Sequence, residues 1–405
     1  MAVEITLTGE RAQSAEETWE QLEPRLGEFG IVRVFDSTPL DFIGVPVFSA
    51  VRPRSKFICV STGKGITQAQ ARVSAAMEAA EIAVAERFPD EDELLWRSPR
   101  EARSEWGYSI VDLCPILGRI ISSDLKLPWV KAKTLAGLEI GVPAEAVYIP
   151  MPRQYGPSFL GCTTAGLGAG RTDAEAIAHA LGELIERDVD SFDNICCQET
   201  KIRPKSLPPS LQGIDDLVTA AGLATSWGSV PNPYGLPFIR AAVFEPEEDD
   251  PLLVGVGIGV HPDAEVAAGK AILEAIQSRI TVIHGGRDDV EDQRVKHAAM
   301  DSTERSRLVA RMRGELESSV TDFEAIPSNQ VAAASLVRVY VNALSLVGVG
   351  PAIVHQFMSS EDPIRIVRVI VPGMENMTTM TEKVGPRLAR HFRDLRAKAK
   401  SSINS

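Results

Sequence analysis

The stretch 172–190, TDAEAIAHALGELIERDVD, decides the fold, because its pattern of residues occurs three times in the chain. A glycine at 168 precedes it, and the three copies align from that glycine onward without insertion. The aligned positions are Gly168, Thr172, Ala176, His179, Glu183 and Glu186; Gly63, Thr67, Ala71, Ser74, Glu78 and Glu81; and Gly259, Asp263, Ala267, Lys270, Glu274 and Gln277. A pattern that keeps its phase in this way indicates a repeated structural unit.

Each copy predicts a β-strand, a glycine turn and a helix, in repeat units over about residues 56–88, 160–192 and 252–284. Outside the repeats, strands and helices alternate without a regular β-α-β order, which favours mixed α+β layers over a doubly wound sheet. Further strands are expected at 31–34, 47–51, 129–133, 146–149, 238–244, 352–357 and 364–371, and further helices from Ser14 and at 210–221, 302–318, 329–345 and 384–400. No long linker is evident, so we expect one intertwined domain over 1–400 and a flexible tail at 401–405.

The composition is that of a globular protein, with 44% hydrophobic and 24% charged residues in a chain of 405. Since no apolar run approaches 18 residues and no basic segment precedes an apolar one at the N-terminus, we expect no membrane span and no secretion signal. The net charge of −13 argues against nucleic-acid binding. The five cysteines show no CxxC pair, which fits a reducing cytoplasm and argues against a zinc site.

The last three aligned positions of each copy, which are His179, Glu183 and Glu186 in the second copy, share one helix face. They do so because they are spaced i, i+4 and i+7. An alanine-rich helix with a few glutamates is most often a helix with a solvated face. A solvated face, however, has no reason to stay in phase with two others. We therefore expect the three faces to converge on a common site.

Converging faces would bring four or five carboxylates into a space of low dielectric constant, where burial of an uncompensated charge is costly. Either the carboxyl pKa values rise or cations lie between them. The donors are oxygens only, since the imidazole of di-iron Glu-x-x-His motifs is missing at Glu81, Glu186 and Gln277. Oxygen ligands suit Mg²⁺, which commonly bridges carboxylates and phosphates. The residues thus predict a Mg²⁺-nucleotide site.

Two glycine turns, 63–65 and 166–170, precede helix N-termini, which can receive phosphate. Each also fits a tight strand-to-helix turn with no ligand, and the chain contains no Walker A motif. Arg187, Arg279 and Arg287 are candidates for neutralising phosphate charge, although such arginines are often surface ion-pair residues. No Ser-His-Asp or Cys-His arrangement is found, so no protein nucleophile is predicted.

Five segments together resemble the YcaO-domain family over nearly the whole chain. They are GKGITQAQARVSAAMEAAE (63–81), GLGAGRTDAEAIAHALGELIERD (166–188), GVHPDAEVAAGKAILEAIQSR (259–279), GGRDD (285–289) and IRIVRVIVPGMEN (364–376). The resemblance implies an α/β fold in which glutamates of the repeat helices hold Mg²⁺ and ATP. It also implies that ATP activates a peptide backbone amide, whose oxygen takes the phosphate. The product is then an azoline, a thioamide or an amidine, according to the nucleophile.

The resemblance also implies roles for individual residues. The expected metal ligands are Glu78, Glu81, Glu175, Glu183, Glu186 and Glu274. The expected nucleotide contacts are Arg11, Thr18, Lys64, Ser74, Gly168, Arg171, His179 and Gln277, and the expected catalytic arginines are Arg187, Arg279 and Arg287. The chain departs from the family at Ile82 (arginine in relatives), Gly168 (serine), Arg171 (asparagine) and His179 (glutamine).

The chain ends RAKAKSSINS, without the proline-rich terminus of azoline-forming members. The form SAAMEAAE at 74–81 resembles members that work beside a TfuA-type protein, which is thought to deliver sulfide. We therefore predict thioamidation of a peptide or protein with a TfuA-like partner, ahead of azoline formation. A nucleotide-binding subunit without its own chemistry and a metal hydrolase that uses no nucleotide are the alternatives. The resemblance also favours a homodimer.

Overall fold

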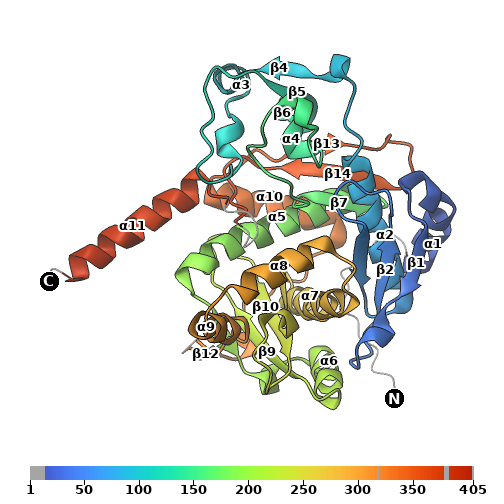
Figure 1. Ribbon diagram of the computed structural model, residues 1–405, viewed down its shortest axis with the longest axis vertical. Helices are drawn as coiled ribbons and strands as arrows, with labels where there is room; N and C mark the ends of the chain where they lie inside the picture. The colour runs from blue at the N-terminus through green and yellow to red at the C-terminus, as the bar shows by residue number, and fades with distance from the viewer. Residues whose placement is uncertain (1–13, 317–318, 378–382, 404–405) are drawn as a thin grey trace. The chain divides into compact units, whose positions relative to one another are not determined.

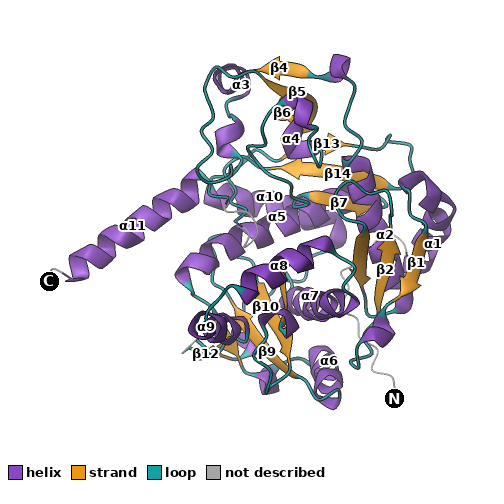
Figure 2. Ribbon diagram, viewed as in Figure 1, coloured by secondary structure: helices purple, strands orange, loops and turns teal. Residues whose placement is uncertain are grey.

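The computed structural model describes residues 14–316, 319–377 and 383–403, drawn as ribbons in Figure 1 and Figure 2. These residues form two compact units, each built from two segments of the chain. The first unit takes 1–83 and 197–339, and the second takes 84–196 and 340–405. The predicted mixed α+β architecture is confirmed, with sheets whose strand pairs are antiparallel apart from the parallel pair of β8 and β12. That 1–400 acts as a single domain stays a prediction.

The first unit contains a three-stranded sheet, β1-β2-β3, and a five-stranded sheet, β11-β10-β9-β8-β12. Its strands are β1 (Arg33–Asp36), β2 (Val47–Val51), β3 (Val60–Lys64), β8 (Thr200–Ile202), β9 (Ala224–Ser229), β10 (Phe238–Phe244), β11 (Gly255–Val260) and β12 (Val320–Thr321). Its helices are α1 (Ala15–Leu22), α2 (Gln68–Ala85, which ends in the second unit), α6 (Pro209–Ala220), α7 (Ala264–His284), α8 (Asp288–Ala298) and α9 (Ser302–Met312).

Strand β10 is buried along nearly its whole length because helices cover both faces of its sheet. Its side chains alternate between the two faces, as the period of a strand requires. Ile239 and Val243 join the core formed with α6 and α7, whereas Ala242 packs with Val309 of α9. Figure 1 shows α6 and α7 beside this sheet.

The second unit is organised by a six-stranded sheet in which β4-β5-β13-β14-β7 lie in order and β6 pairs with β5. Its strands are β4 (Leu95–Arg97), β5 (Leu127–Thr134), β6 (Glu139–Pro143), β7 (Leu167–Gly170), β13 (Ile353–Gln356) and β14 (Arg365–Ile370). Its helices are α3 (Pro99–Trp106), α4 (Ala144–Val147), α5 (Asp173–Cys196), α10 (Leu336–Val347, which begins in the first unit) and α11 (Pro386–Ile403). Helix α5 packs on β7 and β14.

The three repeats share one packing device, a strand glycine against a helix alanine eight residues later. A Cβ atom built on Gly63 would lie 2.5 Å from the Ala71 carbonyl oxygen, and one on Gly168 would lie 2.2 Å from that of Ala176. On Gly259 the distance to the Ala267 carbonyl oxygen would be 2.1 Å. Only glycine lets the helix backbone approach the strand so closely. The repeat is therefore a strand–helix packing unit.

This packing corrects the prediction of glycine turns. Gly63 and Lys64 lie in β3, where Gly63 pairs with Phe48 of β2, and Gly168 and Gly170 lie in β7. The glycines are needed beneath the helices rather than in phosphate-binding loops. The connection to each helix is correspondingly short.

Replacing Gly259 with alanine is expected to destabilise the protein by about 3 kcal/mol, because the added methyl group meets helix backbone that cannot move aside. Gly27 provides the control, since a Cβ atom built there has nothing within 4 Å. Urea unfolding of both variants measures the difference. Equal stability of Gly259→Ala and Gly27→Ala would contradict the packing argument.

Two further expectations differ from the structure. The strand expected at 146–149 is wrong: its first residues form α4, whose Glu145 carboxylate accepts hydrogen bonds from the amides of Phe159 and Leu160 at 2.9 and 3.0 Å. The charged stretch 285–305 contains α8, which was not predicted. In the described part of the chain, no helix combines the length and the apolar character needed to cross a membrane.

Candidate functional site

The in-phase positions form a partly exposed stripe on helices that are otherwise buried. On α2, Ser74, Glu78 and Glu81 are each half-buried, while most of their neighbours are buried alanines and other apolar residues. On α7 the same is true of Lys270, Glu274 and Gln277. These polar side chains reach solvent from within a packed core, which suits ligand binding better than a fully solvated helix face would.

Within the first unit, the α7 stripe lies beside β3. The Lys64 ammonium pairs with the Glu274 carboxylate at 2.9 Å, and both side chains are about one-quarter exposed, at 24% and 28%. The Gln277 amide donates to the Thr62 carbonyl oxygen and, at 3.0 Å, to its hydroxyl. The first and third repeats therefore meet through the strand of one and the helix of the other.

Glu183 on α5 is the most perturbed carboxyl group of the predicted site. Its Oε2 accepts a hydrogen bond from the Gly166 amide at 3.1 Å, and its Oε1 lies 3.7 Å from the Arg187 guanidinium. Burial raises the pKa of Glu183 against the opposing charge of Arg187, and the neighbouring Glu186 raises it further. Glu186 itself is buried. This pair favours a cation.

Glu175 is engaged at the start of α5. Its amide donates to the Thr172 hydroxyl at 3.2 Å, which is one half of the predicted capping box. Its carboxylate accepts the amide of Arg171 at 2.8 Å. The Arg171 guanidinium donates to the Pro363 carbonyl oxygen. These contacts order the turn before α5, and Glu175 as a metal ligand stays a prediction.

The surroundings of Arg279 do not support its predicted phosphate contact. Its guanidinium is 6% exposed and pairs with Asp41 at 2.8 Å and Glu245 at 2.9 Å. A third bond, of 3.2 Å, reaches the Leu253 carbonyl oxygen. The group is held inside the first unit by two carboxylates, so we do not carry Arg279 into the proposed site.

Other predicted contacts are also placed by the structure. The Thr18 side chain is buried in α1 and its hydroxyl donates to the Ser14 carbonyl oxygen at 2.9 Å, which leaves it poorly placed for a nucleotide. Gly168 packs beneath α5, so the serine of relatives would collide with the helix backbone there. His179 is exposed on α5 and Arg287 precedes α8. Arg11 lies outside the described residues.

The predicted metal ligands are divided between the units, with Glu78, Glu81 and Glu274 in the first and Glu175, Glu183 and Glu186 in the second. Among the residues that the structure describes, no group of three His, Cys, Asp or Glu side chains is arranged to hold a metal ion. The donor set nevertheless fits Mg²⁺, because it offers carboxylate oxygens, including those of Glu183, whose pKa burial raises in spite of the nearby Arg187. The shared carboxylate site stays a prediction.

The stability of the metal-free protein is expected to fall as pH rises from the ordinary pKa of glutamate through the higher pKa of folded Glu183. A raised pKa means that the folded state holds the proton more tightly than the unfolded state, so deprotonation favours unfolding. Mg²⁺ should remove much of this loss by stabilising the ionised carboxylate. Melting temperatures against pH, with and without Mg²⁺, check this for the native protein and Glu183→Gln. An unchanged pH slope in the variant would contradict the assignment.

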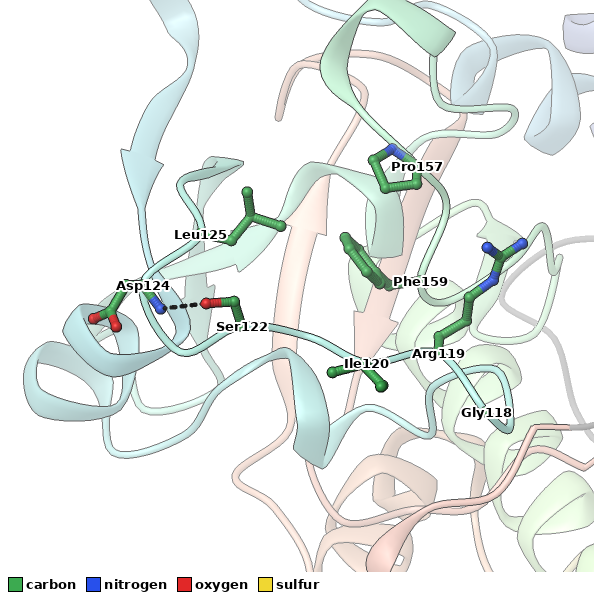
Figure 3. Close-up of a pocket in the computed structure, with 8 residues that line it drawn as sticks. All are labelled: Gly118, Arg119, Ile120, Ser122, Asp124, Leu125, Pro157 and Phe159. Atoms are coloured by element: carbon green, nitrogen blue, oxygen red, sulfur yellow. Dashed lines mark hydrogen bonds between the residues drawn. The ribbon is translucent and has the colours of Figure 1, made fainter.

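The second unit also contains an open pocket of about 700 Å³ that sequence patterns did not predict. Figure 3 shows its apolar side chains, Ile120, Leu125, Pro157 and Phe159, with Arg119 at its edge. The loop that carries Ile120 has no periodic sequence pattern, so the pocket that it lines together with Phe159 is evident only in the folded chain. In the folded chain, Leu117 and Ile120 of this loop are exposed.

Comparison with known proteins places these features in a family. A sequence model of the YcaO cyclodehydratase family, described as binding ATP and Mg²⁺, matches residues 62–375. A protein of unassigned function from Methanothermobacter thermautotrophicus is 33% identical over 387 residues, covering 92% of this chain and 97% of the relative. A Rhizobium leguminosarum bv. trifolii protein, named for its place in the tfuA 3′ region, is 30% identical over 381 residues, covering 90% and 89%.

The fold is similar to that of a solved structure. It is the YcaO protein of Methanopyrus kandleri, bound with AMPPCP and Mg²⁺, and the TM-score is 0.72 at 23% sequence identity. The match covers 93% of this chain and 96% of that protein.

Proposed function

The chain belongs to the YcaO cyclodehydratase family, and from this premise we propose that it uses ATP and Mg²⁺ to activate a backbone amide of a peptide or protein. The observation that carries the proposal is the polar stripe at the same positions of three packed helices, with the half-buried Glu183 and the buried Glu186 on the middle one. These lie within the residues that match the ATP- and Mg²⁺-binding family.

The residues of this chain bind and orient the reactants. Glu78, Glu81, Glu183, Glu186 and Glu274 would hold Mg²⁺, with Glu175 as a further candidate. When bound, Mg²⁺ would neutralise phosphate charge and favour transfer of the terminal phosphoryl group. The Gly166 amide, which donates to Glu183 at 3.1 Å, orients the Glu183 carboxylate.

Cationic side chains would stabilise negative charge on the phosphates. Arg187 is 36% exposed and lies beside Glu183, and the Lys64 ammonium lies beside Glu274. Arg287 remains a candidate on the first unit. Together with Ser74, Gln277, His179 and Arg171, they form the proposed nucleotide contacts. Such contacts act through position and charge, and no protein nucleophile is required.

Thioamidation is the form of the reaction that we favour. Hydrosulfide forms a bond to the carbonyl carbon, and the amide oxygen takes the terminal phosphoryl group of ATP, which releases ADP. Phosphate then leaves with the former amide oxygen, and loss of the S–H proton leaves the C=S bond of the thioamide. The relative named for the tfuA 3′ region supports a TfuA-like partner that supplies the sulfide. The family description as a cyclodehydratase supports azoline formation as the alternative, in which a Cys, Ser or Thr side chain of the peptide is the nucleophile.

Mass spectrometry of a candidate peptide tests the proposal. The peptide is incubated with the protein, Mg·ATP, sulfide and the TfuA-like partner, and each component is omitted in turn. A gain of about 16 Da indicates a thioamide and a loss of about 18 Da indicates an azoline. ATP binding without any peptide modification would favour a nucleotide-binding subunit. No binding of Mg·ATP at millimolar concentration by calorimetry would overturn the proposal and favour a metal hydrolase.

A further inference from the structure

Cys196 and His391 form a thiol–imidazole pair outside the proposed nucleotide site. Cys196 is the last residue of α5, and His391 lies in the second turn of α11, in the same unit. The Cys196 sulfur and the His391 Nε2 atom are 2.9 Å apart, close enough for a hydrogen bond. The two residues are separated by 195 positions, so no local motif predicts the pair. The expectation that the chain has no Cys-His arrangement is therefore wrong.

Contacts between α11 and α5 hold the His391 ring in place. The imidazole packs edge-on against the Phe192 ring, and the two ring centroids are 5.4 Å apart. One turn earlier in α11, the Arg387 guanidinium lies over the same ring at 5.1 Å and pairs with the Asp188 carboxylate at 2.7 Å. These contacts recur every four residues on both helices, which is the spacing of one helix face. A packed helix face thus presents the imidazole to the thiol.

An imidazole beside a thiol turns cysteine into a nucleophile, because the imidazole can take the thiol proton as the sulfur attacks. The end of α5 supports this proton transfer. The C-terminus of a helix carries a partial negative charge, which stabilises a cation beside it, and His391 becomes such a cation when it accepts the proton. Cys196 is also partly exposed, so a small molecule can reach its sulfur.

Two other cysteines of the same unit lie in surroundings that make them less reactive. Cys114 is 2% exposed, and burial raises the pKa of its thiol to about 12. Cys162 is exposed as a residue, but burial of its sulfur raises the pKa of the thiol, and the Glu145 carboxylate adds to the rise. Since the thiolate is the attacking form, exposure alone does not make Cys162 the reactive thiol.

We propose that Cys196, with His391 as its base, is a site of reversible modification by small disulfides of the glutathione class. The Cys196 sulfur attacks one sulfur of the disulfide while its proton passes to His391. The disulfide bond breaks, and a new bond joins Cys196 to one half of the molecule. The other half leaves as a thiolate and takes the proton back from His391. The disulfide itself is the oxidant, so no further reagent is needed.

The modification would break the contact between Cys196 and His391 and thereby weaken the packing of α11 on α5. Mixed disulfides of this kind are transient in a reducing cytoplasm and are typical of redox sensing. The inference does not depend on the proposed amide activation, because it concerns only the contacts between these two helices. Either proposal can therefore fail without the other.

Glutathione disulfide is the probe, and it is added to the full chain in the absence of ATP and peptide. Mass spectrometry of tryptic peptides locates each mixed disulfide by a gain of about 305 Da. Cys197 lies on the same tryptic peptide as Cys196, so Cys197→Ser serves as the background for every variant. We expect Cys196 to be modified at least about tenfold faster than Cys162.

His391→Ala should slow the modification of Cys196 at least about tenfold and leave that of Cys162 unchanged. Imidazole added to the solution should restore part of the rate in His391→Ala, because alanine leaves room for it. Imidazole should not restore the rate in His391→Phe, whose ring fills the space against Phe192. His284→Asn is the control, since His284 belongs to the first unit and stacks on Phe35. Its Cys196 should react at the background rate.

Circular dichroism and melting temperature check that each variant is folded. The proposal would be overturned if Cys196 reacted no faster than Cys162, or if His391→Ala left the rate of Cys196 unchanged. A slower rate that imidazole does not restore would assign His391 a packing role and overturn its part as the base.

Discussion

ATP turnover is expected to fall by about 10² to 10³-fold in Glu183→Gln, while the fold remains intact. Glutamine has nearly the same shape, and its amide oxygen can still accept the hydrogen bond from the Gly166 amide. The substitution removes only the negative charge, which burial already disfavours. Its effect should therefore appear in metal and nucleotide binding rather than in stability.

Phosphate release in the presence of peptide measures this effect, and calorimetry of Mg·ATP measures binding. Glu20→Gln is the matched control, since Glu20 is an exposed glutamate on helix α1. It should turn over ATP at the native rate. Native turnover by Glu183→Gln would show that the metal site does not include this residue.

Replacing Arg279 with methionine is expected to destabilise the protein by about 3 to 5 kcal/mol, because breaking a buried ion pair leaves an uncompensated charge. Its partner Asp41 has a side chain that is 1% exposed, and the two groups are 2.8 Å apart. Glu245, the other partner, is 41% exposed and can be hydrated instead. The penalty should therefore come mainly from Asp41.

Urea unfolding measures this loss, and the double variant Asp41→Asn with Arg279→Met supplies the control. Neutralising Asp41 should recover part of the lost stability, since no buried carboxylate then lacks its cation. The affinity of the folded variant for Mg·ATP should equal that of the native protein. A large loss of ATP affinity with native stability would restore Arg279 as a phosphate ligand.

The repeated helices and several strands were predictable because their signals are local. The strands at 47–51 and 238–244 have the predicted bounds, and the third repeat helix begins and ends within one residue of the prediction. Hydrophobic period, capping residues and glycine spacing all act over a few residues, so one chain segment carries the whole signal. The strand expected at 146–149 failed because distant amides, those of 159 and 160, hold Glu145 in a helical turn.

Residue roles were harder to predict where they depend on contacts between distant segments. In the sequence, Arg279 looks like any arginine on a helix. Only the folded chain shows that it is buried beside Asp41, which lies 238 residues earlier, and this favours a structural role.

The sequence by itself determined the family, the three strand–helix repeats and the phase of their glutamates, because each of these is a matter of residue spacing. The tertiary structure alone decided which repeat glycines lie beneath helices and that Arg279 is buried in an ion pair. The physical reason is that burial and charge neutralisation depend on which segments are neighbours in space. Spacing along the chain places a carboxylate on a helix face, but only packing sets the environment that changes its pKa.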